Sequence, residues 1–187
     1  MRKLISVFII LIILSLHLSC DSSKRDNLIM LKENFEQHNE VFFSLTNLFN
    51  SIPLSLRKDN SIIFSIDNDK DGVEIVIQGK KIVNGKAAIH KSCSLEKDQE
   101  NFNQMLKDLG WTKATVDSLQ NMLRLIKCNS IRTVDYKYYD VEIYNNSTDL
   151  TYSYLHIKPN TNFSDINILS DTSKYGNQFS ISVTSIL

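Results

Sequence analysis

Three aspartates spaced two residues apart, Asp67, Asp69 and Asp71, precede Gly72 and match the first half of an EF-hand-like calcium loop. Alternating carboxylates converge on a hard cation, and glycine permits the sharp turn between them. The second half of the motif is missing, because its twelfth position is Gln78 and strand-like residues flank the loop. The stretch is a candidate structural calcium site, and the alternative that the pattern favours is a solvated hairpin turn.

Cys93 and Cys128 stand just before and just after two predicted helices. An antiparallel pair of helices would return the chain to its start, and a disulfide closing this loop would stabilise the fold by roughly 3–4 kcal/mol. Two buried free thiols are the alternative, since the separation of the two Cα atoms does not follow from the sequence. With His90 the cysteines could form a zinc site or a nucleophile pair, but no further ligand or orienting partner appears at a supporting spacing.

Aromatic side chains are dense in the C-terminal part of the chain. An exposed row of tyrosines could stack on sugar rings or dock a partner, although tyrosine is also favoured in strands, and we prefer this structural reading. The tyrosines concerned are Tyr136, Tyr138, Tyr139, Tyr144, Tyr152 and Tyr154. His38 fills a gap in an apolar stripe and His156 lies in a predicted strand, so we expect both to be structural.

The first twenty residues have the layout of an export signal. Arg2 and Lys3 supply a positive start, and an apolar run over residues 4–16 leads to Leu18-Ser19-Cys20. A spanning helix needs about 20 apolar residues, so this shorter run fits a signal better than a transmembrane span. An uncleaved membrane anchor is the alternative.

The ending Leu18-Ser19-Cys20, followed at once by the polar residues 21–26, resembles a bacterial lipoprotein signal. The resemblance implies that Cys20 receives a diacylglyceryl group, that the chain is cut before it, and that the new amino terminus is acylated, for example by palmitate. Several acyl chains make such an attachment stable. We therefore expect a signal peptide over 1–19, a short lipidated tether over 20–26, and one domain over 27–187, which faces the periplasm or the cell surface.

Composition sets the size of the domain and excludes one class of partner. Residues 20–187 carry 19 Lys and Arg against 21 Asp and Glu, a formal charge of −2, so nothing indicates nucleic-acid binding. A chain of this length can bury a proper core as a single domain.

Hydrophobic periodicity predicts three long helices. The first spans Asn27–Asn50, about 36 Å long, with Asp26 as its N-cap and Pro53 as its stop. The other two form a helical hairpin: one starts at Leu95 after Ser94 and ends before Gly110, and the next starts after Thr112 and ends near residue 127.

Alternating and β-branched stretches predict strands on both sides of these helices. The expected strands cover 61–66 and 73–77 around the aspartate turn, 131–134, 139–144, 150–157 and 178–186, with a second, poorer hairpin over 80–90 and a long loop over 160–176. The sequence therefore predicts an α+β domain, in which a long N-terminal helix and a helical hairpin pack on a mainly antiparallel sheet of five or six strands.

The sequence contains no Ser-His-Asp elbow, no Gly-rich phosphate loop and no His-Glu-x-x-His helix. We assign no catalytic residue and no cofactor beyond the calcium candidate. A lipid-anchored, non-enzymatic binding module with an envelope protein or glycan as partner is the first hypothesis. The alternative is an envelope hydrolase with dispersed catalytic residues, such as His90 or His156 beside a carboxylate.

Overall fold

The computed structural model describes residues 2–67, 72–83, 86–135, 139–146, 151–161, 172–175 and 179–184, and the side chains of these from Asp26 on, except 81–90, 172–175 and 183–184. The helices are α1 (Arg2–Asn50), α2 (Leu54–Asp59), α3 (Gln99–Leu109) and α4 (Lys113–Leu125). The strands are β1 (Asn60–Ile66), β2 (Val73–Val83), β3 (Lys86–Ser94), β4 (Ser130–Thr133), β5 (Tyr139–Asn146), β6 (Thr151–Ile157), β7 (Thr172–Tyr175) and β8 (Phe179–Thr184).

The strands form one sheet of eight in the order β3-β2-β1-β4-β5-β6-β8-β7, and every neighbouring pair is antiparallel. The predicted α+β architecture is confirmed, with more strands than the five or six expected. Both predicted hairpins are present, since β1 pairs with β2 and β2 with β3. One additional strand is β7, which lies inside the stretch predicted as a loop.

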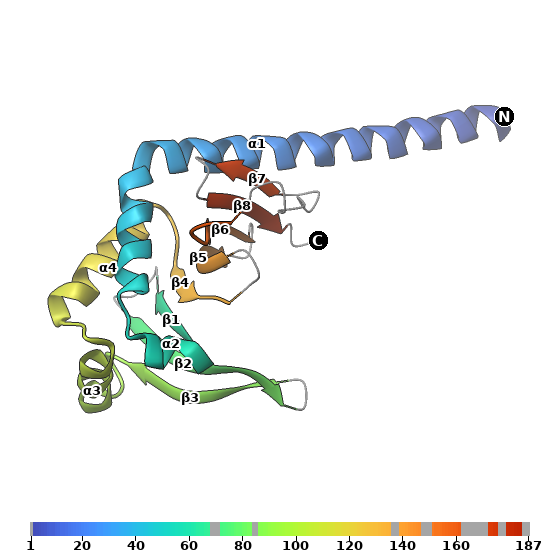
Figure 1. Ribbon diagram of the computed structural model, residues 1–187. Helices are drawn as coiled ribbons and strands as arrows, with labels where there is room; N and C mark the ends of the chain where they lie inside the picture. The colour runs from blue at the N-terminus through green and yellow to red at the C-terminus, as the bar shows by residue number, and fades with distance from the viewer. Residues whose placement is uncertain are drawn as a thin grey trace.

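The chain follows the same plan twice (Figure 1). Helices α1 and α2 precede the meander β1-β2-β3, and helices α3 and α4 precede the strands β4-β5-β6. The two sets join where β1 pairs with β4 in the middle of the sheet. Helices α3 and α4 therefore carry the chain from the edge strand β3 back across β2 and β1.

Helix α1 covers the predicted span Asn27–Asn50, which confirms a long helix there, but it is bent. His38 has non-helical backbone angles, φ −125° and ψ 24°, and the helix turns sharply there (Figure 1). Asp26 is not a helix start, because α1 extends through it. The predicted end near Pro53 is correct: α1 ends at Asn50, and the guanidinium of Arg57 donates to the carbonyl oxygens of Asn50 and Ile52 at 2.9 and 2.8 Å.

The caps of α3 and α4 show why these helices start and stop where they do. The side chain of Asp98 accepts from the amide of Asn101 at 3.2 Å, so α3 starts four residues later than predicted, after β3 has continued to Ser94. Gly110 ends α3 in the left-handed conformation, φ 72°, as predicted. Thr112 forms a capping box with Thr115 at the start of α4, which confirms that start.

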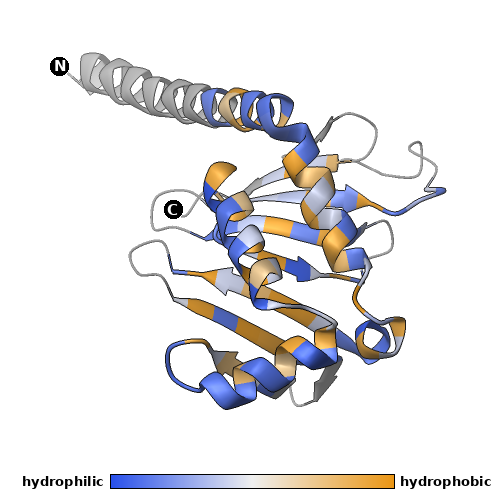
Figure 2. Cartoon of the chain, turned by 90° about the vertical axis from the view of Figure 1, so that its left-hand side faces the viewer, coloured by the Kyte–Doolittle hydropathy of each residue, from blue (hydrophilic) through white to orange (hydrophobic). Residues whose placement is uncertain are grey.

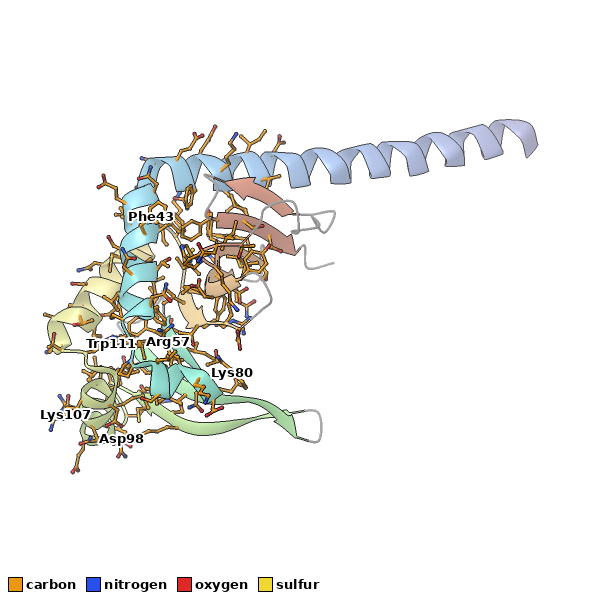
Figure 3. All side chains as sticks on the ribbon, viewed as in Figure 1. Phe43, Arg57, Lys80, Asp98, Lys107 and Trp111 are labelled. Carbon is orange, nitrogen blue, oxygen red and sulfur yellow. The ribbon has the colours of Figure 1, made fainter. Side chains whose placement is uncertain are left out.

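The helices cover one face of the sheet, and the core lies between them (Figures 1 and 2). Phe42 on the second arm of α1 is fully buried, with its ring centroid 4.5 Å from that of Tyr154 on β6. Trp111, in the connection between α3 and α4, packs against Phe49 of α1 and Phe64 of β1 with ring centroids 5.4 and 6.2 Å apart (Figure 3). These aromatic contacts fix the helices on the sheet.

Candidate binding site on the open face of the sheet

Residues of the central strands alternate between the helix-covered face and the opposite face, which we call the open face. On β5 and β6, Ile143 is opposite Tyr154 on the covered face, whereas Tyr144 is opposite Ser153 on the open face. The next strand continues both rows, with Ile181 opposite Tyr154 and Ser182 opposite Ser153. The covered face is therefore apolar and the open face is built from small hydroxyl and charged side chains.

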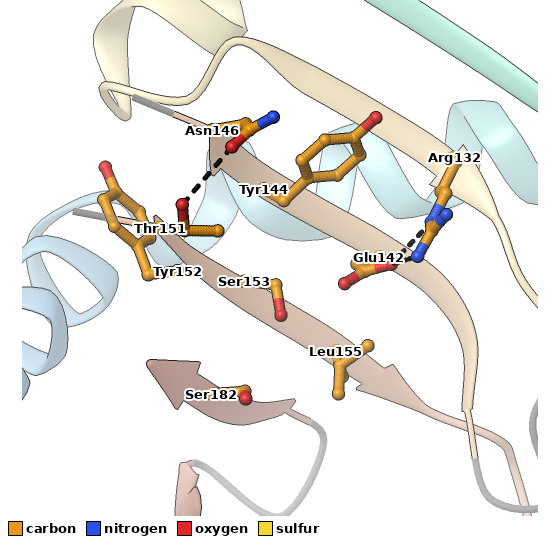
Figure 4. Close-up of a pocket in the computed structure, with 9 residues that line it drawn as sticks. All are labelled: Arg132, Glu142, Tyr144, Asn146, Thr151, Tyr152, Ser153, Leu155 and Ser182. Atoms are coloured by element: carbon orange, nitrogen blue, oxygen red, sulfur yellow. Dashed lines mark hydrogen bonds and ion pairs between the residues drawn. The ribbon is translucent and has the colours of Figure 1, made fainter. Parts of the chain in front are cut away.

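A pocket of about 360 Å³ lies on the open face over β4, β5, β6 and β8 (Figure 4). Its lining residues are Arg132, Glu142, Tyr144, Asn146, Thr151, Tyr152, Ser153, Leu155 and Ser182. This volume falls in the range of about 300–1,000 Å³ that is typical of small-molecule sites. The pocket mixes aromatic, hydroxyl, amide and charged groups, and its lining residues Ser153 and Leu155 are buried.

Arg132 and Glu142 are directly opposite each other on β4 and β5 and form an ion pair at the pocket. Nε of Arg132 donates to Oε2 of Glu142 at 2.6 Å, and its second terminal nitrogen lies 2.5 Å from the same oxygen. The guanidinium carbon also lies 5.5 Å from the ring centroid of Tyr144, within the range of a cation–π contact. These three side chains hold one another in place.

The other end of the pocket is lined by hydroxyl and amide groups. Ser153 and Ser182 are opposite each other on β6 and β8, and their small side chains leave room above the sheet. The hydroxyl of Thr151 donates to Oδ1 of Asn146 at 3.3 Å across β5 and β6. A ligand in the pocket would meet both hydrogen-bond donors and acceptors.

The preferred structural reading of the tyrosines is confirmed for Tyr152 and Tyr154, which do not belong to an exposed row. Tyr152 and Tyr154 are buried on the covered face, where their hydroxyls donate to the carbonyl oxygens of Lys127 and Leu31 at 2.7 and 3.1 Å. Burial raises the pKa of both phenols above the ordinary value, so both stay neutral. Alternation along the strand is the cause, because Tyr152 and Tyr154 share one face and Tyr144 belongs to the other.

Among the remaining tyrosines, Tyr139 and Tyr144 are half-buried, and Tyr136 and Tyr138 lie outside the described residues. Tyr144 and Tyr152 both border the pocket, and Tyr144 is the one that belongs to the open face of the sheet.

Cys93 and Cys128 are both buried free thiols, so the disulfide that the sequence left open is not formed. The register places Cys93 beside Ile75, Ile75 beside Phe64, and Phe64 beside Ile131. Three strand spacings separate β3 from β4 by about 14 Å, too far for a bridge. The two helices cross the sheet instead of returning to their start, and their axes lie at a steep angle to each other (Figure 1).

The thiols are also unsuited to nucleophilic chemistry. Burial raises the pKa of the Cys128 thiol above its ordinary value, and it raises that of Cys93 as well. No group of three or more metal-ligating side chains occurs among the residues whose side chains are described, and the side chain of His90 lies outside that set.

The calcium candidate falls mainly outside the described residues. Asp67 follows β1, and its amide donates to the carbonyl oxygen of Gly72 at 3.0 Å, which closes the base of the β1-β2 hairpin. Asp69 and Asp71 are not described. The hairpin that the alternative reading required is confirmed by the pairing of Ile66 with Val73.

His38 and His156 have different surroundings. His38 lies at the bend of α1. Nδ1 of His156 lies 2.8 Å from Oδ1 of Asp140, and the imidazole packs edge-on against Phe179 on the covered face. Within the described parts of the chain, no serine or cysteine side chain hydrogen-bonds to this imidazole, and the open-face pocket lies on the other side of the sheet.

A second hollow of about 210 Å³ lies between α1 and the end of α4. Its floor is occupied by a polar cluster, since Nδ2 of Asn34 donates to the carbonyl oxygen of Ile126 at 2.9 Å and to the hydroxyl of Tyr154 at 3.1 Å. At its rim Met30 is 48% exposed, and the neighbouring Ile29 is 47% exposed. No helix is long and apolar enough to cross a membrane within the described side chains.

The sequence analysis missed Arg132, Glu142, Ser153 and Ser182 as site residues. Each is an ordinary open-face residue of its own strand, and none belongs to a recognisable motif. Only the pairing of β4 with β5 and of β6 with β8 places them around one pocket. The local signal, a polar residue at every second position, reports which face is open but not which strands are neighbours.

Comparison with models of protein families, with curated proteins and with solved structures gives no match. The function is therefore argued from the geometry of this chain alone.

Proposed function

We propose that this chain is a lipid-anchored protein of the bacterial cell envelope that binds a ligand on the open face of its sheet and catalyses no reaction itself. The observation that carries the binding role is the pocket between Arg132, Tyr144 and Ser182. It combines a suitable volume with converging polar groups and the aromatic side chain of Tyr144 on the open face. A binding module needs such a preformed hollow, and the sheet provides a rigid support for it.

The proposed anchor is argued from the N-terminal sequence and from one surface feature. Leu18-Ser19-Cys20 has the order of a lipoprotein processing site, and the first described side chains follow six residues later. Ile29 and Met30 expose about half of their apolar surface on the same helix. A short tether would hold these two side chains close to the lipid, where their exposure no longer costs free energy.

Intact-mass measurement of protein extracted from membranes tests the anchor. We expect a chain that begins at Cys20 and is heavier by its acyl groups. The variant Cys20→Ala should lack this added mass and leave the membrane fraction. An unmodified Cys20 in wild-type protein from the soluble fraction would refute the anchor and leave the pocket hypothesis standing.

Site-specific photo-crosslinking in intact cells tests the binding role. A crosslinking amino acid with an aromatic ring at position 144, which keeps a ring in the place of Tyr144, should give discrete adducts that a pocket-filling variant, Ser182→Phe, abolishes. The matched control carries the crosslinker at position 78, on the same face of β2 but outside the pocket. Equal adduct patterns from positions 144 and 78 would contradict the proposed site.

The hydrolase alternative rests on one observation, the contact of His156 with Asp140. A carboxylate that orients an imidazole is part of many general-base sites. The pair lies on the covered face beside the fully buried Phe179, and the pocket lies on the opposite face. We therefore place the ligand on the open face and give the pair a structural role. A variant His156→Gln that stays folded should keep the photo-crosslinks formed from position 144.

A further inference from the structure

The geometry points to a neutral oligosaccharide as the ligand of the open-face pocket, an inference that rests on the proposed binding role and names its ligand class.

Two parallel rows of side chains cross the open face at the pocket. The first runs from Tyr144 through Ser153 to Ser182, an aromatic ring followed by two hydroxyls. The second runs from Arg132 through Glu142 to Leu155, an ion pair followed by an apolar side chain. Each row therefore offers polar groups beside an apolar surface.

A sugar ring also combines an apolar surface with polar groups. One face of a pyranose presents C–H groups, which pack against an aromatic ring, and its rim presents hydroxyls, which both donate and accept hydrogen bonds. Tyr144 supplies the aromatic partner, and its contact with the guanidinium of Arg132 fixes the ring. The hydroxyls of Ser153 and Ser182 and the amide of Asn146 supply partners for the rim.

The charges of the lining select against ions. Among the described residues of the lining, Arg132 and Glu142 carry the charges, of opposite sign, and they pair at 2.5–2.6 Å. An anionic ligand would have to displace the Glu142 carboxylate from the guanidinium, and a cationic ligand would have to displace the Arg132 guanidinium. A neutral ligand with many hydroxyls can hydrogen-bond to the intact pair without either cost.

The backbone beneath the pocket selects against an extended peptide. Peptides that bind sheets by strand addition use the unpaired N–H and C=O groups of an edge strand. Strand β5 is paired on both sides, with β4 and β6, and β6 is paired with β5 and β8. A ligand at this place must therefore be recognised by side chains, which suits a ring with hydroxyls on its rim.

Binding of the intact lipoprotein, in detergent micelles, to an array of neutral, sialylated and sulfated oligosaccharides tests this inference. We expect neutral oligosaccharides to bind, and Tyr144→Ala to weaken that binding at least tenfold. Gln78→Ala, on the same face but outside the pocket, is the matched control and should bind as the wild type does. Circular dichroism checks that each variant is folded.

The variant Glu142→Gln sharpens the test, because it removes the negative partner of Arg132. We expect it to lose affinity for neutral oligosaccharides and to gain binding of sialylated or sulfated ones. A wild-type protein that binds no neutral oligosaccharide, or that binds only the acidic ones, would overturn the inference. If photo-crosslinks from position 144 persist in that case, the binding role survives and only the ligand class is wrong.

Discussion

Tyr144 and Tyr154 lie on neighbouring strands, β5 and β6, but on opposite faces of the same sheet. Tyr154 is fully buried, and its hydroxyl donates to the carbonyl oxygen of Leu31 and accepts from Nδ2 of Asn34. Tyr144 is half-buried and borders the open-face pocket. Tyr154 thus holds α1 on the covered face, whereas Tyr144 borders the pocket on the open face.

The difference teaches where stability and where binding reside in this fold. The covered face is filled by aromatic and branched side chains that pack against α1 and α4. The open face carries small polar residues and one ion pair, which contribute little burial of apolar surface. Substitutions on the covered face should therefore lower the free energy of unfolding, whereas substitutions at the pocket should mainly change binding.

The largest effect is expected for Phe42→Ala. The Phe42 ring is fully buried against Phe35, Tyr154 and Phe179. Its loss should lower the free energy of unfolding by about 3–5 kcal/mol, because it removes buried apolar surface and leaves a cavity. Chemical denaturation measures this, with Tyr144→Ala as the open-face control, expected to cost less than about 1 kcal/mol. Equal losses from the two variants would break the comparison.

A smaller loss is expected for Tyr154→Phe, which removes one hydroxyl and keeps the ring. The carbonyl oxygen of Leu31 would then lack this donor, at a cost of about 1–3 kcal/mol in the free energy of unfolding. Tyr144→Phe is the matched variant on the open face, and we expect a change within about 0.5 kcal/mol. Denaturation midpoints of the two variants, measured side by side, check the pair.

The buried side chains of Cys128, Tyr152 and Tyr154 should make the free energy of unfolding depend on pH. Burial raises the folded-state pKa of Cys128, Tyr152 and Tyr154. Their neutral forms stabilise the fold fully below the unfolded pKa values, about 8.5 for a thiol and about 10 for a phenol. Above these values the unfolded state loses protons first, so the free energy of unfolding should fall as pH rises.

The covered face is thus predicted to be sensitive to alkali. Denaturation midpoints between about pH 8 and pH 10 should decline less steeply in Cys128→Ala than in the wild type, because the thiol that ionises first on unfolding is gone. If the denaturation midpoint falls equally steeply with pH in both proteins, the Cys128 thiol is not buried in the way that the structure shows.

The smallest effect is expected at the aspartate turn. Asp67 closes the β1-β2 hairpin through its backbone, and we read the turn as a solvated connection with no ion. The melting temperature should be the same in calcium and in a chelator. A melting temperature that is higher in calcium than in the chelator, with no such difference in Asp69→Asn, would instead support the calcium candidate.

Local elements whose signals lie within a few residues could be predicted from the sequence. Gly110 predicted the end of α3 because it can adopt the left-handed conformation, and Thr112 predicted the start of α4 because its hydroxyl can accept from a backbone amide. Alternation predicted the strands around Ile63 and Ile143, and with them the α+β class.

Where two local signals competed, the sequence was less reliable. Ser94 and Asp98 are both plausible helix caps, and the pairing of Ser94 with Glu74 extended β3 and moved the start of α3 to Asp98. The apolar stripe of α1 continues past His38, so it did not reveal that the helix bends there to follow the sheet. Tertiary packing decided both points.

The order of the strands in the sheet could not be predicted from local patterns. The order β3-β2-β1-β4 separates Cys93 from Cys128, and the order β4-β5-β6-β8 assembles the pocket from Arg132, Tyr144 and Ser182. Pairing between distant strands depends on the burial of a whole face, which no stretch of a few residues encodes. The physical reason is the range of the interaction: caps and turns act over a few residues, whereas a sheet face is completed by the entire chain.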